Sequence, residues 1–176
     1  MTTELIFYDA SVPPKNPPKA DGVAGYIGGD TPHVWTRAEW DSQPPRYRLP
    51  IFTRSDPAAA GISATADAEA AIRQLGAIGA PKGSIVALDS ETSIDPAYVK
   101  AFYNTIAAAG YTFMDYASQD NLFANDPSGT GGYYWGADWT GRQHIAPGDS
   151  GTQYASDAEW DLDVFRAGLP FWDTHP

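Results

Sequence analysis

A short apolar run, Ile85–Leu88, restricts the fold of this chain more than any other stretch. It follows a proline, a glycine and a serine and holds two β-branched residues, which is typical of a short strand buried on both faces. Asp89 and Glu91 come next and point to the same side of an extended backbone. Asp95 and Pro96 then predict the start of a helix. A buried strand, an acidic end and a helix form half of a β/α unit, and α/β enzymes carry their chemistry at such strand ends.

The rest of the chain repeats this strand-and-helix rhythm and then abandons it. Further strands are expected over residues 5–9, 22–27, 49–53 and 111–116, and helices from Thr36, over 65–78 and from Asp95 to Gly110. Beyond them we expect a short helix over 118–124 and strands over 133–138, around 152–154 and over 161–165. The pattern predicts one α/β domain over residues 1–176, an irregular TIM-like barrel of about five β/α units followed by three strands with few helices. An open doubly wound sheet is the alternative.

Composition excludes several classes of partner. The 176 residues carry a net charge of −11, which disfavours binding to nucleic acid or to an anionic membrane surface. The apolar runs fall far short of the roughly 18 residues of a membrane span. The first thirty residues contain several prolines where a secretory signal would have a basic and then an apolar region, so we expect no such signal. There is no cysteine, and the three histidines lack metal-ligand spacing, so we expect no disulfide, metal or cofactor.

Four carboxylates converge on one end of the predicted barrel. Asp9 ends the first strand, Asp89 and Glu91 follow the fourth, and Asp161 marks the last. Crowded carboxylates differ in pKa, as the acid-catalysed cleavage of a glycosidic bond requires. Aromatic residues at or near the strand ends could stack on sugar rings, although ordinary packing explains most of them equally well.

Five short segments occur in the order in which they appear in a known enzyme family. They are YDAS (8–11), ALDSE (87–91), AAAGYTFMDYAS (107–118), YYWGAD (133–138) and QYASD with WDLDVF (153–165). Together they resemble the family 25 glycoside hydrolases, which are N-acetylmuramidases, or lysozymes, built on an irregular barrel. The stretch 71–89 is similar to a sister group, the glycoside-hydrolase-like barrels of unknown function common in actinobacteria.

The resemblance implies a role for each acid. Glu91 would be the general acid, and Asp89 would position the acetamido group or stabilise charge. Asp9 and Asp161 would hold the sugar and tune Glu91. The substrate-binding residues would be Tyr116, Trp135, Tyr26 and Gln153. The chain departs from the family pattern after YDAS, where a Gln is missing, and over residues 25–35, where the usual Lys and Glu are absent.

The sequence therefore predicts a lysozyme-like glycoside hydrolase that acts on peptidoglycan or a related amino-sugar polymer without a cofactor. The alternative is a catalytically inactive barrel that binds cell-wall glycan or serves as a structural module. A wall-degrading protein without a signal peptide would fit a bacteriophage lysin or tail component, with other particle proteins as partners. A protein that stays in the bacterial cytoplasm is a further alternative.

Overall fold

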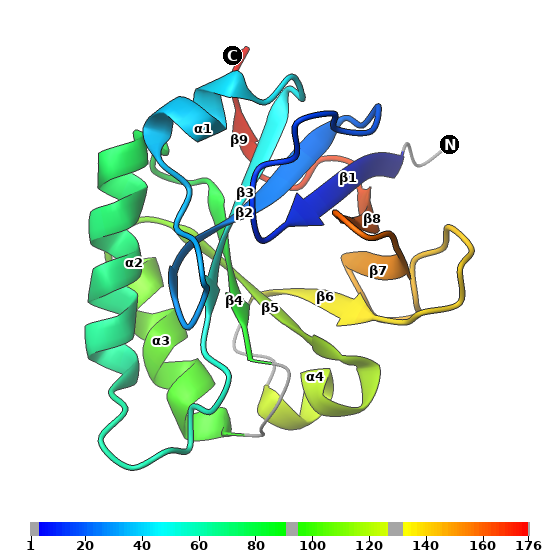
Figure 1. Cartoon of the computed structure of the whole chain (residues 1–176). Coiled ribbons are helices and arrows are strands. Elements are labelled where there is room, and N and C mark those ends of the chain that lie inside the picture. The colour runs from blue at the N-terminus through cyan, green and yellow to red at the C-terminus, as the bar shows by residue number, and fades with distance from the viewer. Residues whose placement is uncertain (1–3, 91–94, 127–131, 176) are drawn as a thin grey trace.

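A computed structural model describes residues 4–90, 95–126 and 132–175 of the chain (Figure 1). The strands are β1 (Glu4–Ala10), β2 (Gly22–Gly29), β3 (Tyr47–Thr53), β4 (Ile85–Asp89), β5 (Thr112–Ser118), β6 (Tyr133–Ala137), β7 (Gly151–Ser156), β8 (Asp161–Arg166) and β9 (Trp172–Asp173). The helices within these ranges are α1 (Arg37–Ser42), α2 (Ala64–Ile78), α3 (Pro96–Ala108) and α4 (Gln119–Asn125). None of these helices is both long and apolar enough to cross a membrane.

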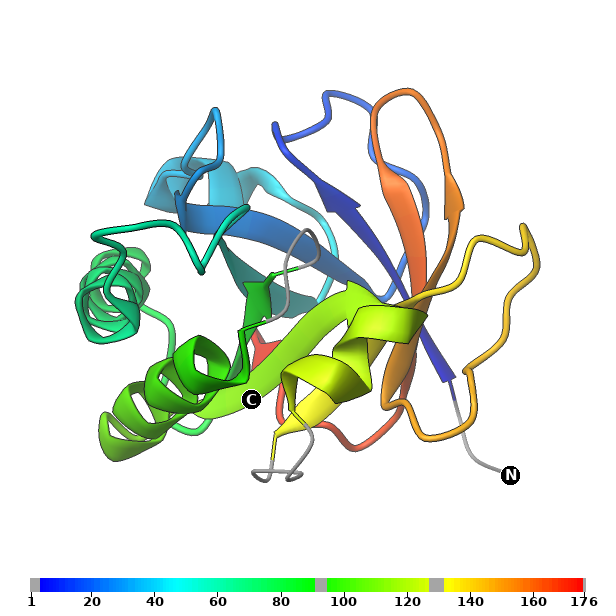
Figure 2. The ribbon, with the colours of Figure 1, turned by 90° about the horizontal axis from the view of Figure 1, so that it is seen from below.

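Strands β1 to β8 form a closed barrel, which Figure 2 shows as a ring. Neighbouring strands from β1 to β7 are parallel, and β2 pairs with β3 to complete the ring. Strand β8 is antiparallel to both β7 and β1. The prediction of an irregular TIM-like barrel is confirmed, and the open doubly wound sheet is excluded because the sheet closes on itself.

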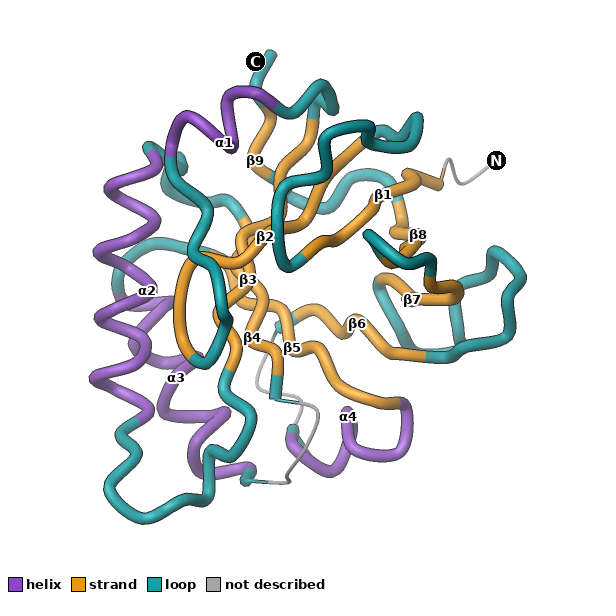
Figure 3. The backbone as a smooth tube through the Cα atoms, viewed as in Figure 1, coloured by secondary structure: helices purple, strands orange, loops and turns teal. Residues whose placement is uncertain are grey.

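The connections explain how so short a chain closes a barrel. Figure 3 shows that loops alone join β6, β7 and β8. A proline-containing loop, rather than a helix, also joins β1 to β2, and the four helices within the described ranges are those expected from the sequence. Strand β9 was not predicted; it pairs antiparallel with Tyr47 and Arg48 at the start of β3.

Local sequence signals fix where the helices begin and end. Thr36 and Glu39 form a capping box at the start of α1, with both reciprocal hydrogen bonds present. Asp95 caps α3 by accepting hydrogen bonds from two backbone N–H groups. Gly79 ends α2 with a φ of 77°, a conformation that glycine adopts without steric cost.

Two apolar cores lie on either side of the barrel wall, and β4 contributes to both. Ile85 and Ala87 face the interior, where they join Phe7, Phe165 and the other inward side chains. Val86 and Leu88 face outward and pack beneath the helices α2 and α3, which Figure 1 shows side by side along the outside of the sheet. All four β4 residues named here are fully buried. The expected burial on both faces is therefore confirmed.

Candidate active site

The carboxyl ends of the parallel strands form one mouth of the barrel, and acidic residues gather there. Asp9 lies near the end of β1, and Asp89 ends β4. Strand β8 runs in the opposite direction, so its first residue, Asp161, reaches the same mouth and pairs in register with Asp9. The structure thus brings together three of the four predicted acids. The fourth, Glu91, lies outside the described residues.

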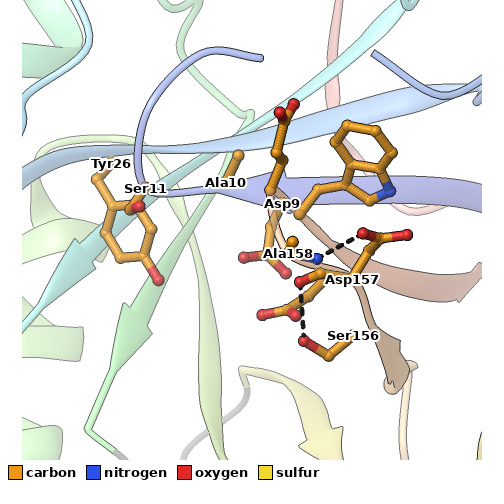
Figure 4. A pocket seen from close by; sticks show the side chains of 10 residues that line it. Asp9, Ala10, Ser11, Tyr26, Ser156, Asp157 and Ala158 are labelled. Carbon is orange, nitrogen blue, oxygen red and sulfur yellow. Dashed lines mark hydrogen bonds between the residues drawn. The ribbon is translucent and has the colours of Figure 1, made fainter. Parts of the chain in front are cut away.

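A pocket of about 280 Å³ opens at this mouth (Figure 4). Its lining comes from the end of β1, from β2 and from the turn between β7 and β8: Asp9, Ala10, Ser11, Tyr26, Ser156, Asp157, Ala158, Glu159, Trp160 and Asp161. Four of these residues are acidic, and none of the four forms an ion pair with a Lys, Arg or His among the described residues. The pocket therefore has a strongly negative wall.

Asp9 is the most deeply placed acid of the pocket lining, with only 5% of its surface exposed. Gln153 donates a hydrogen bond of 2.7 Å from Nε2 to Oδ2 of Asp9, and Tyr116 donates one of 2.5 Å to Oε1 of Gln153. Burial, followed by the negative charge of Asp161, raises the pKa of Asp9 to about 7. Asp9 can therefore gain or lose a proton near neutral pH.

Asp163 is a second buried acid in this group, and the sequence reasoning missed it. It is fully buried, and Trp135 donates a hydrogen bond of 3.2 Å from Nε1 to its Oδ1. Its Oδ2 has no hydrogen-bond partner among the described residues. Burial, followed by the negative charge of Asp9, raises the pKa of Asp163 well above its ordinary value, so its protonated form is favoured.

The signal for Asp163 was present in the sequence as the i, i+2 spacing from Asp161. Two such residues of a strand share one face, the same rule that joined Asp89 to Glu91. The antiparallel direction of β8 decides which of the pair lies deeper. Asp161 sits at the rim, half-buried, with a pKa raised by burial, while Asp163 lies one step further into the barrel.

The four predicted substrate-binding residues occupy two different depths. Tyr26 is half-buried and lines the pocket. Tyr116, Trp135 and Gln153 are 6%, 1% and 3% exposed and lie inside the barrel, where they contact one another or the buried acids. In this arrangement Trp135 offers no free ring face to a sugar. It donates to Asp163, whereas Gln153 donates to Asp9 and is itself bonded by Tyr116.

A second group of polar residues lies on the outer face of the barrel wall beneath α4. Asp115 is fully buried and accepts a hydrogen bond of 3.4 Å from Ser90, and its Oδ2 has no hydrogen-bond partner in the described part of the chain. Burial, followed by the charge of Asp126, raises the pKa of Asp115 to about 8. Asn125 completes the group by donating to Ser90 Oγ at 3.3 Å. The sequence analysis did not single out these residues.

The acids of the mouth do not form an evident metal site. Within residues 4–90, 95–126 and 132–175, no group of three or more His, Cys, Asp or Glu side chains is arranged to hold a metal ion. The site described here thus consists of protonated and ionised carboxyl groups with amide, phenol and indole donors. Such a set can donate a proton, accept one, and stabilise positive charge.

Comparison with known proteins identifies the fold. No family model matches the chain, and no curated protein sequence matches it. An uncharacterized protein of B. stearothermophilus has a similar structure, with a TM-score of 0.77 and 16% identity over 94% of this chain and 97% of that one. The Tat-secreted protein Rv2525c of Mycobacterium tuberculosis has a TM-score of 0.66 and 12% identity, over 96% of this chain and 98% of its own.

The barrel is also similar to that of a modular endolysin. The Cpl-1 endolysin, from the phage Cp-1, was solved with a peptidoglycan analogue and matches with a TM-score of 0.61 and 14% identity. The match covers 97% of this chain and 56% of the endolysin. At these identities the likeness establishes the fold alone. The chain therefore has a barrel fold that also occurs in cell-wall endolysins.

Proposed function

We propose that this protein is a lysozyme-like glycoside hydrolase that cleaves peptidoglycan or a related amino-sugar polymer. The observation that carries the proposal is the pair of buried carboxyl groups, Asp9 and Asp163, both with raised pKa, beneath an open acidic pocket. The occurrence of the same fold in an endolysin solved with a peptidoglycan analogue supports the choice of substrate.

Glycosidic cleavage by carboxylates needs two groups in different protonation states. One must protonate the leaving oxygen, and another must stabilise or attack the cation that develops at the sugar. We assign the first role to Glu91, two positions beyond Asp89 in the chain, on the strength of the family resemblance. Asp89, whose negative charge contributes to the raised pKa of Asp9, would position the substrate or stabilise the cation.

Asp9 and Asp161 would hold the sugar and set the protonation of the acid. They face each other in the β1–β8 pair, and each carries a raised pKa. A proton retained on one carboxyl removes a charge that would otherwise repel its neighbours, and an ionised carboxylate beside it attracts a cation. The mouth can therefore keep one acid protonated near neutral pH while another remains charged.

A glycan-binding module without catalysis is the second candidate. It is favoured by the internal hydrogen bonds from Tyr116 to Gln153 and from Gln153 to Asp9, which occupy polar groups that a substrate would otherwise contact. The two segments that depart from the family pattern also meet beside the pocket, where Trp35 Nε1 donates to the Ser11 carbonyl at 3.3 Å.

Release of soluble muropeptides from purified peptidoglycan tests the proposal. The wild type should release them, and Glu91→Gln should abolish release while the thermal midpoint stays unchanged or rises, because the substitution removes a negative charge two positions from Asp89 in the chain. Glu69→Gln, which neutralises an exposed acid on α2, is the matched control and should retain full activity.

Two outcomes would overturn parts of the proposal. Binding to peptidoglycan without release, by the wild type at every pH from about 4 to about 8, would identify a binding module. Turnover retained by Glu91→Gln would remove Glu91 as the acid. A bacteriophage origin, as a lysin or a tail module, stays a prediction from the sequence.

A further inference from the structure

Two consecutive hydrogen bonds cross the interior of the barrel and end on Asp9. The Tyr116 hydroxyl, on β5, donates to Gln153 Oε1 at 2.5 Å, and Gln153 Nε2, on β7, donates to Asp9 Oδ2 at 2.7 Å. In the ring of Figure 2, β6 separates β5 from β7, and β8 separates β7 from β1. This relay of Tyr116, Gln153 and Asp9 therefore spans the interior instead of following one pair of neighbouring strands.

Burial makes each group of the relay depend on the others. Tyr116, Gln153 and Asp9 are all buried, and the side chains that share the interior with Tyr116 are largely apolar, Met114 and Phe165 among them. A buried polar group that loses its partner costs about 1–3 kcal/mol. The hydroxyl, the amide and the carboxyl group are therefore confined to arrangements in which donors meet acceptors.

The two ends of the Gln153 amide are not interchangeable. The amide oxygen only accepts hydrogen bonds, and the amide nitrogen only donates them. With Nε2 toward Asp9 the amide stabilises an ionised carboxylate, whereas Oε1 in that place would require a proton on the carboxyl group. The orientation of one buried amide is therefore linked to the charge of Asp9.

Tyr116 supports the orientation that favours the charged form of Asp9. Because its hydroxyl donates to Oε1, this oxygen is held away from Asp9 and Nε2 is directed at the carboxylate. A donor on the amide oxygen also polarises the amide, which strengthens the hydrogen bond that its N–H group makes. A phenylalanine at position 116 would lose both effects.

The surroundings of Asp9 favour its neutral form, and the relay opposes them. Burial, followed by the charge of Asp161, raises the pKa of Asp9, while the hydrogen bond from Gln153 lowers it. The other described ionisable groups that face Asp9 or line its pocket are Asp163 on β8, Asp89 on β4, Tyr26 on β2, and Asp157 and Glu159 in the turn before β8. A neutral amide thus supports an anion that burial and a neighbouring acid disfavour.

We propose that Tyr116 is a positioning residue of the candidate active site, and that its hydroxyl orients the Gln153 amide so that Asp9 keeps its charge near neutral pH. This role differs from the direct substrate contact that the family resemblance implies for Tyr116 and Gln153. The catalytic part of the inference rests on the proposed hydrolase, in which a charged Asp9 would attract the cation that develops at the sugar. The orienting part requires no substrate.

An NMR titration of the Asp9 carboxyl carbon, assigned by its loss in Asp9→Asn, tests the relay. Tyr116→Phe should raise the pKa of Asp9 by about 0.5 to 1 pH unit, the equivalent of one hydrogen bond. Gln153→Met keeps the side-chain length but removes both contacts, and it should raise the pKa by about 1 to 2 pH units. Tyr116→Phe should add nothing in the Gln153→Met background, and additive shifts would overturn the relay.

Tyr8→Phe is the matched control. Tyr8 is also buried and also donates to an amide oxygen, Oε1 of Gln43 at 2.8 Å, but the nitrogen of that amide donates to the Ser42 hydroxyl at 3.0 Å. Tyr8 precedes Asp9 in the chain and packs in the core outside the barrel wall, so its loss should leave the Asp9 titration in place. No shift in folded Tyr116→Phe, or an equal shift in Tyr8→Phe, overturns the proposal.

The pH dependence of muropeptide release connects the relay to catalysis. Since turnover would need a charged Asp9, Tyr116→Phe should move the acidic limb of the activity profile upward by the same amount as the Asp9 titration, with little change in KM. A limb that stays in place while the titration moves overturns the catalytic part of the inference. Absence of release by the wild type overturns the proposed hydrolase and leaves the titration result standing.

Discussion

The buried carboxyl groups of Asp9 and Asp163 lie on the neighbouring strands β1 and β8, and the negative charge of Asp9 raises the pKa of Asp163. Two buried carboxyl groups that interact in this way cannot both be ionised without strong repulsion, so the pair retains a proton. This relationship ties the stability of the barrel to the protonation of the proposed active site.

Stability should fall as pH rises from about 4 to about 8. The pKa of Asp9 is raised to about 7 and that of Asp115 to about 8, so the folded protein holds protons that the unfolded chain has already lost. Thermal midpoints measured across this range should decrease, and Asp9→Asn should flatten the decrease below pH 7. A midpoint that rises from pH 4 to pH 8 would contradict these assignments.

Below about pH 4 the sign reverses. Arg46 donates to Asp173, and this hydrogen bond lowers the pKa of Asp173 to about 2. The stability supplied by this pair is therefore lost as pH falls from about 4 through about 2. Asp173→Asn should weaken the response of the thermal midpoint to acid in this lower range.

Replacement of Asp115 by asparagine should stabilise the protein in mildly alkaline solution. The wild-type carboxyl must ionise in a fully buried position near Asp126 and Asp89, whereas the amide stays neutral. We expect Asp115→Asn to unfold at a similar denaturant midpoint near pH 4 and to be about 1–3 kcal/mol more stable than the wild type near pH 9. Asp120→Asn, at an exposed position of α4, should show no such pH-dependent gain.

Asn125 should be required to hold the end of β4 against the start of α3. Its side chain donates to the carbonyl and the hydroxyl of Ser90 and accepts the N–H of Asp95 at 2.9 Å. Asn125→Ala leaves these groups unsatisfied and should cost about 1–3 kcal/mol. Hydrogen exchange at the Asp95 amide should accelerate, and Asn104→Ala on the exposed side of α3 should leave it unchanged. Unaltered exchange in Asn125→Ala would show that this contact is dispensable.

Two glycine-to-alanine substitutions should change stability in opposite directions. A Cβ at Gly151 would lie 2.1 Å from the buried ring of Phe165, so Gly151→Ala should destabilise the barrel by about 1–3 kcal/mol. A Cβ at Gly76, in α2, would meet nothing within 4 Å, so Gly76→Ala should stabilise by about 0.5–1 kcal/mol. Urea unfolding of both variants checks the pair, and equal effects would refute the packing argument.

The sequence predicted those features of the fold that depend on neighbouring residues. The helix starts at Thr36 and Asp95 and the end of the helix predicted over 65–78 each depend on contacts within a few positions, and the structure has all three. Strand β9 was missed because its two residues are held by distant contacts, such as the ion pair between Arg46 and Asp173.

The sequence analysis missed Asp115 and Asp163 for a similar reason, because their burial depends on segments far away in the chain. Met114 and Tyr116 face the barrel interior, so Asp115 between them faces outward, where α4 buries it. The sequence shows the alternation but not that the outer face is covered. Asp163 was passed over in favour of Asp161 because the depth of each depends on the direction of β8, which only the pairing of the strands reveals.

The reversed direction of β8 also affects how the mouth can vary between related proteins. The parallel strands β2 to β5 each lead from the rim into a connection that contains a helix. The segment from Ser156 to Asp161 is instead a hairpin turn, and it supplies six of the ten residues that line the pocket. Insertions there would reshape the pocket while the hydrogen-bonded strands stay in register. This turn is therefore the natural position at which to graft a new specificity onto the barrel.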